Sequence, residues 1–338
     1  MAVGVSFEAP DWPMFGLADD MRPAMGEAAR AGQAFAVATL YAVGAGGPRP
    51  PGSQMVISPG AITGFLSGGC IEADIAVHAA AVIEDGEPRH LVYGEGSPWP
   101  DIRLLCGARL DILVERVAPD DAALATLFAE TEARRPAVWV SDGRARRLEP
   151  AADGDLARCA VRAGPFELRR LYTPVPRLVV FGSDPIALAT ASLGAQAGFE
   201  TTLVRPNGPS APPPLAGVAY SRASPVAALA EIVPDPWTAI AVATHDLEVD
   251  HEALAAALPS KASYVGVVGA RRRVAERLAR LSAEGVDRAS LDRLRAPIGL
   301  DLGGKAPWEV AVSVIAEIIA ARADRSIEAG GSEGGLSL

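Results

Sequence analysis

The stretch that decides the fold is LVVFGSDPIALATASLGAQAGFETTLV, which runs from Leu178 to Val204. Its first four residues, 178–181, are apolar and predict a buried strand, whereas residues 184–197 predict a helix. Residues 201–204 then predict a second strand. A strand, a helix and a strand in this order are typical of a parallel βαβ unit. The pattern therefore favours an α/β fold.

The same alternation continues along the chain. Residues 239–243 and 264–268 predict further strands, and a helical stretch follows each of them. A parallel sheet with helices on both faces buries such continuous apolar strands. We therefore expect a Rossmann-like domain over residues 175–325. The tail, residues 326–338, is rich in Gly and Ser and should be disordered.

The first third of the chain predicts another α/β domain, over residues 17–117. A chain of 338 residues is long enough for about two domains. A helix over 17–31 would be capped by Asp19 or Asp20, and a second helix over 71–84 has apolar residues at helical spacing. The predicted strands of this domain cover residues 34–41, 54–57, 89–93 and 109–117.

Two segments of irregular pattern separate these elements. Residues 44–52 are rich in Gly and Pro and predict a loop. Residues 118–174 are interpreted as a connector, with a helix over 120–134 and a hairpin that turns at Asp142-Gly143. The connector either stands alone or belongs to the first domain.

The composition argues against several classes of protein. A net charge of -10 disfavours general nucleic-acid binding, which needs a basic face. No apolar run approaches the ~20 residues that span a bilayer. Residues 1–16 lack the basic start and apolar block of a signal peptide. The three cysteines favour a reducing, cytoplasmic setting, and their spacing fits no zinc-site pattern.

The loop Ser67-Gly68-Gly69-Cys70 is the first candidate for a functional site. It precedes a helix that is predicted from Ile71, and glycines let a backbone approach a ligand closely. The free N–H groups of a helix N-terminus favour an anion. A cysteine there should have a lowered pKa, and its thiolate binds metals. The alternative is a buried cysteine in a tight turn, which is the commoner context of an isolated Gly-Gly-Cys.

The other two cysteines carry weaker signals. Cys106 lies with Gly107 just before the strand over 109–117 and shares the first domain with Cys70. A buried structural cysteine is the default interpretation for Cys106 alone. Cys159 lies in the connector and is interpreted as structural.

The turn Gly182-Ser183-Asp184 lies where a dinucleotide-binding fingerprint would begin. Asp184 replaces the second glycine of that fingerprint and Ala187 replaces the third. A carboxylate at this position would repel a pyrophosphate. The next strand ends at Arg205, where an NAD site expects an acid for the ribose. Binding of NAD(P) is therefore disfavoured.

Further candidates follow the later strands of the Rossmann-like domain, where ligand crevices form. His245 and Asp246 either form a proton-transfer pair, or Asp246 caps the next helix. Gly269 precedes three arginines that begin with Arg271, and guanidinium groups bind phosphate oxygens. Asp301 lies in a glycine-rich loop that either cradles a phosphate or is a plain loop.

In their order along the chain, these stretches resemble the XdhC/CoxI family of molybdenum cofactor insertion and sulfuration accessory proteins. The resemblance covers residues 17–325, approximately. Its most specific blocks are SGGCIE, from Ser67, and PIGLDLGG, from Pro297. The other matching stretches are residues 48–55, Cys106-Gly107, 243–246, 264–273 and 307–322.

The resemblance implies a chaperone rather than an enzyme. Such proteins transiently bind molybdenum cofactor, which is molybdopterin with its metal, possibly as a dinucleotide. They hold it while its terminal sulfido ligand is installed and deliver it to apo-enzymes of the xanthine dehydrogenase and aldehyde oxidase type. The implied partners are the apo-molybdoenzyme, a cysteine desulfurase and a second copy of the chain, with neither nucleic acid nor membrane.

The residue patterns and the resemblance together give a set of candidate cofactor-binding residues. Two of them, Cys70 and Cys106, are also candidate molybdenum contacts, and no catalytic residue is assigned. The set is Ser67, Gly68, Gly69, Cys70, Glu72, Cys106, Gly182, His245, Asp246, Gly269, Arg271 and Asp301.

The chain also departs from the family pattern. Gly182-Ser183-Asp184-Pro185 stands where Gly-Ala-Gly-His is usual, and Ala108 replaces the last glycine of Cys-Gly-Gly. These departures move the expected site toward the first domain. Two alternatives remain: an NAD(P)-dependent oxidoreductase, which the fold alone suggests, and a thiol enzyme with Cys70 as nucleophile and His245 as base.

Overall fold

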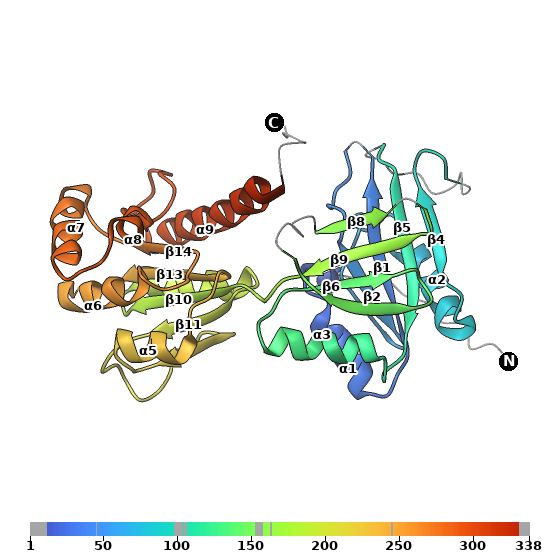
Figure 1. Cartoon of the computed structure of the whole chain (residues 1–338), viewed down its shortest axis with the longest axis horizontal. Helices are drawn as coiled ribbons and strands as arrows, with labels where there is room; N and C mark the ends of the chain where they lie inside the picture. Colours follow the sequence, from blue (N-terminus) through green and yellow to red (C-terminus); the bar gives the residue numbers. More distant parts are fainter. Residues whose placement is uncertain are drawn as a thin grey trace. The chain divides into compact units, whose positions relative to one another are not determined.

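The structure is a computed structural model that describes residues 12–44, 46–97, 104, 107–152, 158–162, 164–244 and 246–330, with side chains to residue 323. The chain divides into two compact units, Met1–Pro174 and Val175–Leu338 (Figure 1). Residues 118–174 lie in the first unit. The expected fold class, an N-terminal α/β domain followed by a Rossmann-like parallel-sheet domain, is confirmed.

The second unit contains a six-stranded parallel sheet. Its order is β12-β11-β10-β13-β14-β15, which is the arrangement of a Rossmann fold, and the order reverses between β10 and β13. The strands are β10 (Arg177–Gly182), β11 (Glu200–Val204), β12 (Val218–Ser221), β13 (Thr238–Ala243), β14 (Tyr264–Val267) and β15 (Leu294–Arg295).

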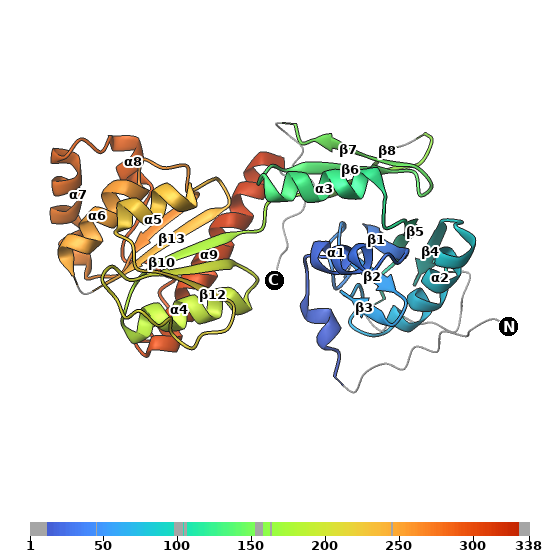
Figure 2. The ribbon, with the colours of Figure 1, turned by 90° about the horizontal axis from the view of Figure 1, so that it is seen from below.

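Helices cover both faces of this sheet (Figure 2). Side chains alternate along β10 between two cores, one on each face of the sheet. Val179 and Phe181 lie in the core beneath a first set of helices, and Leu178 and Val180 lie in the core beneath a second set. The first set is α5 (Pro225–Ile232), α6 (Leu247–Ala257), α7 (Val274–Ala283) and α8 (Arg288–Asp292), and the second is α4 (Pro185–Gln196) and α9 (Pro307–Gly330).

The last helix is longer than the sequence predicts. Residues 326–330, which we expected to be part of a disordered tail, continue α9 to Gly330. The segment before that glycine contains Ala, Arg and Glu, which have high helix propensity and extend the helix past the expected boundary.

The first unit is built on a five-stranded antiparallel sheet of order β3-β2-β1-β5-β4, called sheet A below. Ala36, Ala38 and Leu40 of β1 face α2 (Glu72–Asp85), whereas Phe35 and Val37 face a second core. That core also contains residues of α1 (Arg22–Arg30) and α3 (Ala122–Glu132). The strands are β1 (Phe35–Val43), β2 (Gln54–Ser58), β3 (Ala61–Thr63), β4 (Arg89–Tyr93) and β5 (Leu110–Val117).

The predicted hairpin of the connector belongs to a four-stranded antiparallel sheet of order β7-β6-β9-β8, called sheet B below. The hairpin is β6 (Ala137–Ser141) with β7 (Arg146–Pro150). The sequence analysis did not predict β8 (Cys159–Arg162) or β9 (Glu167–Tyr172).

The helix predicted over 17–31 is shorter in the structure, and its predicted cap is wrong. A short 3-10 helix, η1, covers Met14–Leu17, and α1 begins only at Arg22, where the N-cap residue Met21 makes no side-chain cap. Asp20 accepts hydrogen bonds from the backbone and the guanidinium of Arg22. Asp19 instead pairs with arginines from distant segments, which draws it away from the helix.

In the part of the chain that the structure describes, no helix is both long enough and apolar enough to cross a membrane.

Candidate functional site

Three loops of the first unit leave sheet A at the same end. Val43, at the end of β1, and Tyr93, at the end of β4, both pair with Leu110, at the start of β5. The end of β3 lies toward this end as well, because β2 and β3 pair in antiparallel fashion. The loops over 44–53, 64–71 and 94–109 therefore emerge together. Antiparallel pairing thus places the ends of β3 and β4 and the start of β5 at one end of the sheet, beside the Ser67–Cys70 loop.

The loop before α2 closes on the carboxylate of Glu72, whose exposed fraction is only 2%. The hydroxyl of Ser67 donates to Glu72 Oε2 at 2.8 Å. Five backbone N–H groups donate to the same carboxylate at 2.7 to 3.3 Å. They belong to Leu66, Ser67, Gly68, Gly69 and Ile71.

This arrangement corrects one expectation from the sequence. The N–H groups assigned there to an anionic ligand already bind Glu72, and Glu72 is an internal partner of the loop. Burial alone would raise the pKa of Glu72, but hydrogen bonds from the backbone and hydroxyl of Ser67 and from Leu66 outweigh it and hold that pKa below its usual value. The ionised carboxylate therefore fixes the conformation of the loop.

Cys70 lies at the exposed tip of this fixed loop. It is a free cysteine, and its backbone N–H donates to Ser67 Oγ at 3.0 Å. The neighbouring Gly68 and Gly69 have φ of 92° and 112°, which side chains rarely tolerate. The alternative of a buried cysteine is therefore wrong for Cys70.

The other cysteines differ from Cys70. Cys106 lies outside the described residues; the N–H of Gly107 donates to the carbonyl of Leu104 at 3.0 Å. Cys159 is half-buried, and burial raises the pKa of its thiol to about 11. A thiol with that pKa stays protonated at neutral pH, which fits a structural residue.

The candidate residues of the second unit follow the carboxyl ends of its parallel strands. Gly182 ends β10, Asp246 follows β13, Gly269 and Arg271 follow β14, and Asp301 follows β15. Parallel strands end at one edge of the sheet, so these five residues share that edge. His245 lies outside the described residues.

At this edge too, helix N-termini are capped by the chain's own carboxylates. Asp184 accepts the N–H of Ala187 at 2.7 Å at the start of α4, where a pyrophosphate would bind in a dinucleotide site. Asp246 accepts the N–H of Glu248 at 2.9 Å and caps α6, which confirms the capping alternative for that residue. The loop before α9 is closed in the same way, since Glu309 accepts N–H groups at 2.9 and 3.0 Å.

Gly182 is required by packing. A Cβ atom at this position would lie 2.3 Å from the carbonyl oxygen of Ala243 and 2.6 Å from Cβ of Ala187. Both distances are far below van der Waals contact. The glycine therefore lets β10, β13 and α4 pack closely, whether or not a ligand is present.

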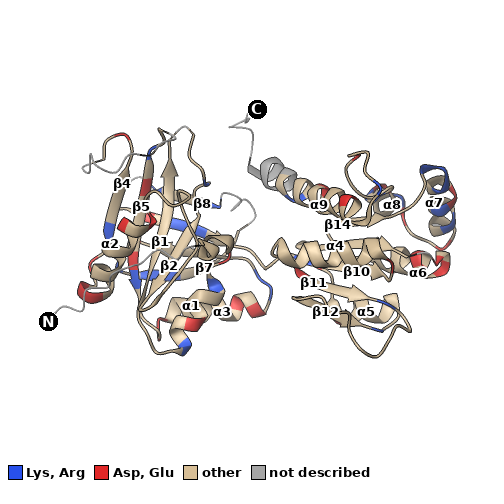
Figure 3. Ribbon diagram, turned by 180° about the vertical axis from the view of Figure 1, so that it is seen from behind, with Lys and Arg blue, Asp and Glu red and all other residues tan. Residues whose placement is uncertain are grey.

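A polar cluster that sequence reasoning missed lies behind this edge. Asp250 is 3% exposed and accepts hydrogen bonds from Thr244 Oγ1 at 2.6 Å and from Arg277 at 3.0 Å. Nearby, Arg271 and Asp301 are brought within 3.6 Å, and both side chains are largely exposed. Figure 3 shows basic residues gathered at the start of α7. Helical periodicity does not predict the pairing of Asp250 with Arg277, because the two residues lie on different helices.

Within the described residues, no three side chains of His, Cys, Asp or Glu come together in a way that holds a metal ion.

Both units match models of one protein family. The model described as "XdhC and CoxI family" matches residues 28–94, and the model described as "XdhC Rossmann domain" matches residues 178–318. The first match contains the Ser67–Cys70 loop and Glu72. The second contains Gly182, Asp246, Gly269, Arg271 and Asp301.

Similar proteins agree with these matches. The "Molybdenum cofactor insertion chaperone PaoD" of Escherichia coli (strain K12) is 32% identical over 297 residues, which cover 88% of this chain and 86% of that protein. A Bacillus subtilis (strain 168) protein described as a subunit of a "Probable xanthine dehydrogenase" is 30% identical over 151 residues, 44% of each chain.

A solved structure supports the fold. The crystal structure of a xanthine dehydrogenase from Bacillus halodurans superposes with a TM-score of 0.71 and covers 90% of this chain and 96% of that chain, at 22% identity. The two family matches and the relative that aligns along most of both chains lead to one conclusion. The chain belongs to the XdhC and CoxI family.

Proposed function

We propose that this protein is a chaperone for molybdenum cofactor. It binds the cofactor transiently, holds it while the terminal sulfido ligand is installed, and delivers it to an apo-enzyme of the xanthine dehydrogenase or aldehyde oxidase type. The observation that carries the proposal is the exposed Cys70 on a loop that Glu72 holds in one conformation. The name of the relative PaoD supports the same cargo.

The chemistry of the loop fits this cargo. Thiolates are soft ligands that suit the metal and sulfur chemistry of such a cofactor. Cys70 is exposed, so a large cofactor can reach it and a client protein can take the cofactor away. Cys106 is proposed as a second contact because its loop emerges at the same end of sheet A.

The partners and the form of the cofactor also belong to the proposal. We infer an apo-molybdoenzyme and a cysteine desulfurase as partners, a homodimer as the working state, and the cytoplasm as the place of action. We also propose that candidate residues of the second unit contact the cofactor, which is possibly a dinucleotide: Gly182, His245, Asp246, Gly269, Arg271 and Asp301.

Binding of NAD(P) as the main function is disfavoured by a specific contact. The carboxylate of Asp184 caps α4, at the place where the pyrophosphate of NAD would need free N–H groups. A thiol enzyme with Cys70 as nucleophile would need a base beside it. Among the described side chains no contact supplies one.

A loading experiment separates these functions. The purified full-length chain is incubated in parallel with molybdenum cofactor and with NADH, and bound ligand is followed by absorbance and phosphate analysis after gel filtration. We expect the molybdenum cofactor to be retained and NADH to elute freely. Retention of NADH without molybdenum cofactor would disprove the proposal.

A further inference from the structure

We propose that Arg49 and Arg158 form an anion-binding site that receives a phosphate group of the cargo. This inference rests on the proposed function for the identity of the cargo. The anion site itself follows from the contacts of the two arginines. It is a function that the sequence analysis did not assign to either residue.

Both guanidinium groups share one carboxylate. Arg49 Nη2 and Arg158 Nη2 each donate to Asp19, and the Arg158 contact is 3.0 Å. Arg49 Nε is buried and has no hydrogen-bond partner among the described residues. The side chains of Arg49 and Arg158 stay 22% and 36% exposed. Two positive charges share one negative charge, and both side chains are partly exposed to solvent, so a further anion can reach the guanidinium groups and neutralise the remaining charge.

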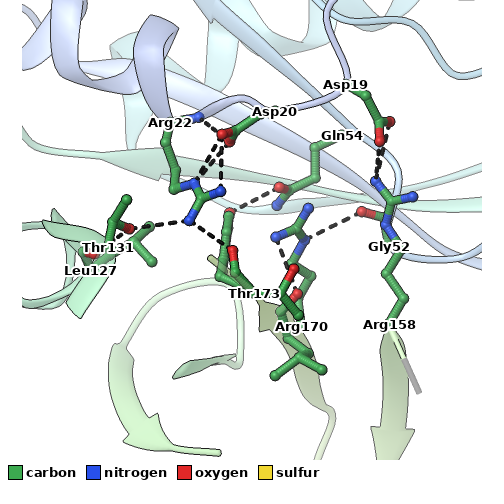
Figure 4. A network of polar contacts seen from close by, with 12 residues as sticks. Asp19, Asp20, Arg22, Gly52, Gln54, Leu127, Thr131, Arg158, Arg170 and Thr173 are labelled. Carbon is green, nitrogen blue, oxygen red and sulfur yellow. Dashed lines mark hydrogen bonds and ion pairs between the residues drawn. The ribbon is translucent and has the colours of Figure 1, made fainter. Parts of the chain in front are cut away.

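Neighbouring arginines add to this positive potential (Figure 4). Arg170 is only 6% exposed, stacks on Tyr172 at 3.7 Å, and donates to the carbonyl of Gly52 at 3.3 Å. No carboxylate lies within 4 Å of Arg170 in the described part of the chain. Burial lowers the pKa of Arg170, and the charges of Arg158 and Arg22 lower it further, although Tyr172 and Asp20 act in the opposite direction. A buried guanidinium without a carboxylate partner favours an anion close by.

The two arginines lie beside the Cys70 loop. The guanidinium of Arg49 lies over the ring of Phe65, 4.9 Å from its centroid, and Phe65 is two residues before Ser67. Arg158 packs against Gly52, where an added Cβ would lie 2.8 Å from its side chain. Gly52 belongs to the loop over 44–53, which emerges from the same end of sheet A as the Cys70 loop. A phosphate held here can therefore belong to the ligand that reaches Cys70.

The internal partner of the loop before α2 leaves side chains as the available anion ligands near Cys70. The N–H groups of the Cys70 loop bind Glu72 and cannot receive a phosphate without displacing it. Guanidinium groups present paired donors in a plane that matches phosphate oxygens. The proposed ligand class is therefore a phosphomonoester or a similar small oxyanion.

Calorimetric titration of the full chain with inorganic phosphate, at constant ionic strength, tests the site. We expect the wild-type chain to bind phosphate, and Arg49→Gln and Arg158→Gln each to weaken the affinity by about tenfold or more, as for the loss of a hydrogen bond to a charged group. Arg144→Gln is the matched control, because Arg144 pairs with Glu87 on another surface. Equal phosphate affinity in all four proteins would overturn the proposal.

A variant that should bind phosphate more tightly than the wild type provides a test that loss of folding cannot mimic. Asp19→Asn removes the carboxylate that competes with the incoming anion, so we expect tighter phosphate binding than in the wild type. Weaker binding in this variant, with an unchanged circular dichroism spectrum, would contradict the proposed site.

The molybdenum cofactor itself distinguishes this inference from the proposed function. If phosphate binding depends on the arginines but the wild-type chain retains no cofactor, the anion site stands and the proposed function fails. If the cofactor is retained equally by the wild type and Arg49→Gln, the proposed function stands and these arginines do not receive the phosphate of the cargo.

Discussion

At the scale of single residues, the carboxylate of Glu72 takes the place that a bound anion would otherwise have in the loop before α2. Five N–H groups and a hydroxyl converge on it. Removing the charge leaves buried donors without a partner, which costs more than the hydrogen bonds themselves contribute. The position of Cys70 at the tip of this loop therefore depends on Glu72.

Glu72→Gln should loosen this loop. We expect the amide protons of residues 66–71 to exchange at least about tenfold faster and the free energy of unfolding to fall by about 1–3 kcal/mol. Hydrogen exchange and urea denaturation measure these effects. Glu84→Gln, on the exposed side of the same helix, should change neither quantity. Unchanged protection of residues 66–71 in Glu72→Gln would show that the loop is held by other contacts.

The sequence predicts the roles of some single residues but not of others. Asp184 before Pro185 and Asp246 before α6 fit the ordinary pattern of an acid that caps a helix. Glu72 follows Ser67 by five positions, which is not the spacing of a capping box, so its role gave no local signal. The exposure of Cys70 depends on the loop conformation and was likewise not readable.

At the scale of elements, sheet B packs against sheet A around the buried carboxylate of Glu115. Glu115 of β5 is 1% exposed and accepts hydrogen bonds from Trp139, Ser141 and Arg146. Arg146 also contacts Asp121 at 2.7 Å, and its side chain is 8% exposed. A buried charge that loses its partner is strongly destabilising.

Glu115→Gln should therefore lower the free energy of unfolding of the first unit by about 3–5 kcal/mol. Arg144→Gln, which removes only an exposed ion pair with Glu87, should lower it by less than about 1 kcal/mol. Denaturant titration followed by tryptophan fluorescence gives both values. A small effect of Glu115→Gln, equal to that of the control, would mean that other contacts hold sheet B, such as apolar packing and the hydrogen bond from Tyr172 to Gln54.

The close packing of β10, β13 and α4 at Gly182 leads to a prediction for Gly182→Ala. The added methyl group would overlap the carbonyl of Ala243 and the side chain of Ala187. We expect a loss of about 1–3 kcal/mol in the stability of the second unit, which thermal unfolding measures, because overpacked sites must shift their neighbours. Gly198 also has a positive φ, but a Cβ added there would meet no atom within 4 Å. Gly198→Ala therefore serves as a control for backbone strain without overlap. Gly182→Ala with wild-type stability would be incompatible with this packing.

A pH dependence follows from the contact between sheet B and β4. The ring centroids of His90 and Phe166 lie 4.5 Å apart, and burial lowers the pKa of His90. The unfolded chain therefore binds a proton at His90 at a higher pH than the folded chain does. Stability should fall as the pH is lowered through about 6.5. In His90→Phe this part of the pH dependence should vanish. A variant with the wild-type pH profile would exclude His90 as its source.

Elements differed in how clearly the sequence predicted them. Strands β10, β11, β13 and β14 of the parallel sheet were predicted closely, because each contains a run of apolar or β-branched residues. The short strands β12 and β15 were not predicted. Strand β8 has only four residues, and β9 contains Glu167, Arg169 and Arg170, in a small sheet stabilised by contacts such as Arg169 with Glu149. Such strands have no clear apolar periodicity. Their pairing is a tertiary effect that local pattern does not predict.

At the scale of the whole molecule, two units of one family carry separate candidate residues. Each unit has its own strand and helix pattern in the sequence, on which the predicted domains rest. The sequence did not predict the contacts of Asp19 with Arg49, 30 positions away, and with Arg158, 139 positions away. Such contacts arise only when the chain is folded. No sequence motif therefore indicated the proposed anion site.

The central claim is that the first unit holds molybdenum cofactor through Cys70. The most direct test loads the wild-type chain, Cys70→Ala and Cys159→Ala with molybdenum cofactor and measures bound molybdenum per chain after gel filtration. We predict that the wild type and Cys159→Ala, which lacks the half-buried cysteine of β8, retain molybdenum. Cys70→Ala should retain about tenfold less, the loss of roughly 1.4 kcal/mol of binding free energy or more. Equal retention by Cys70→Ala and the wild type would contradict the account.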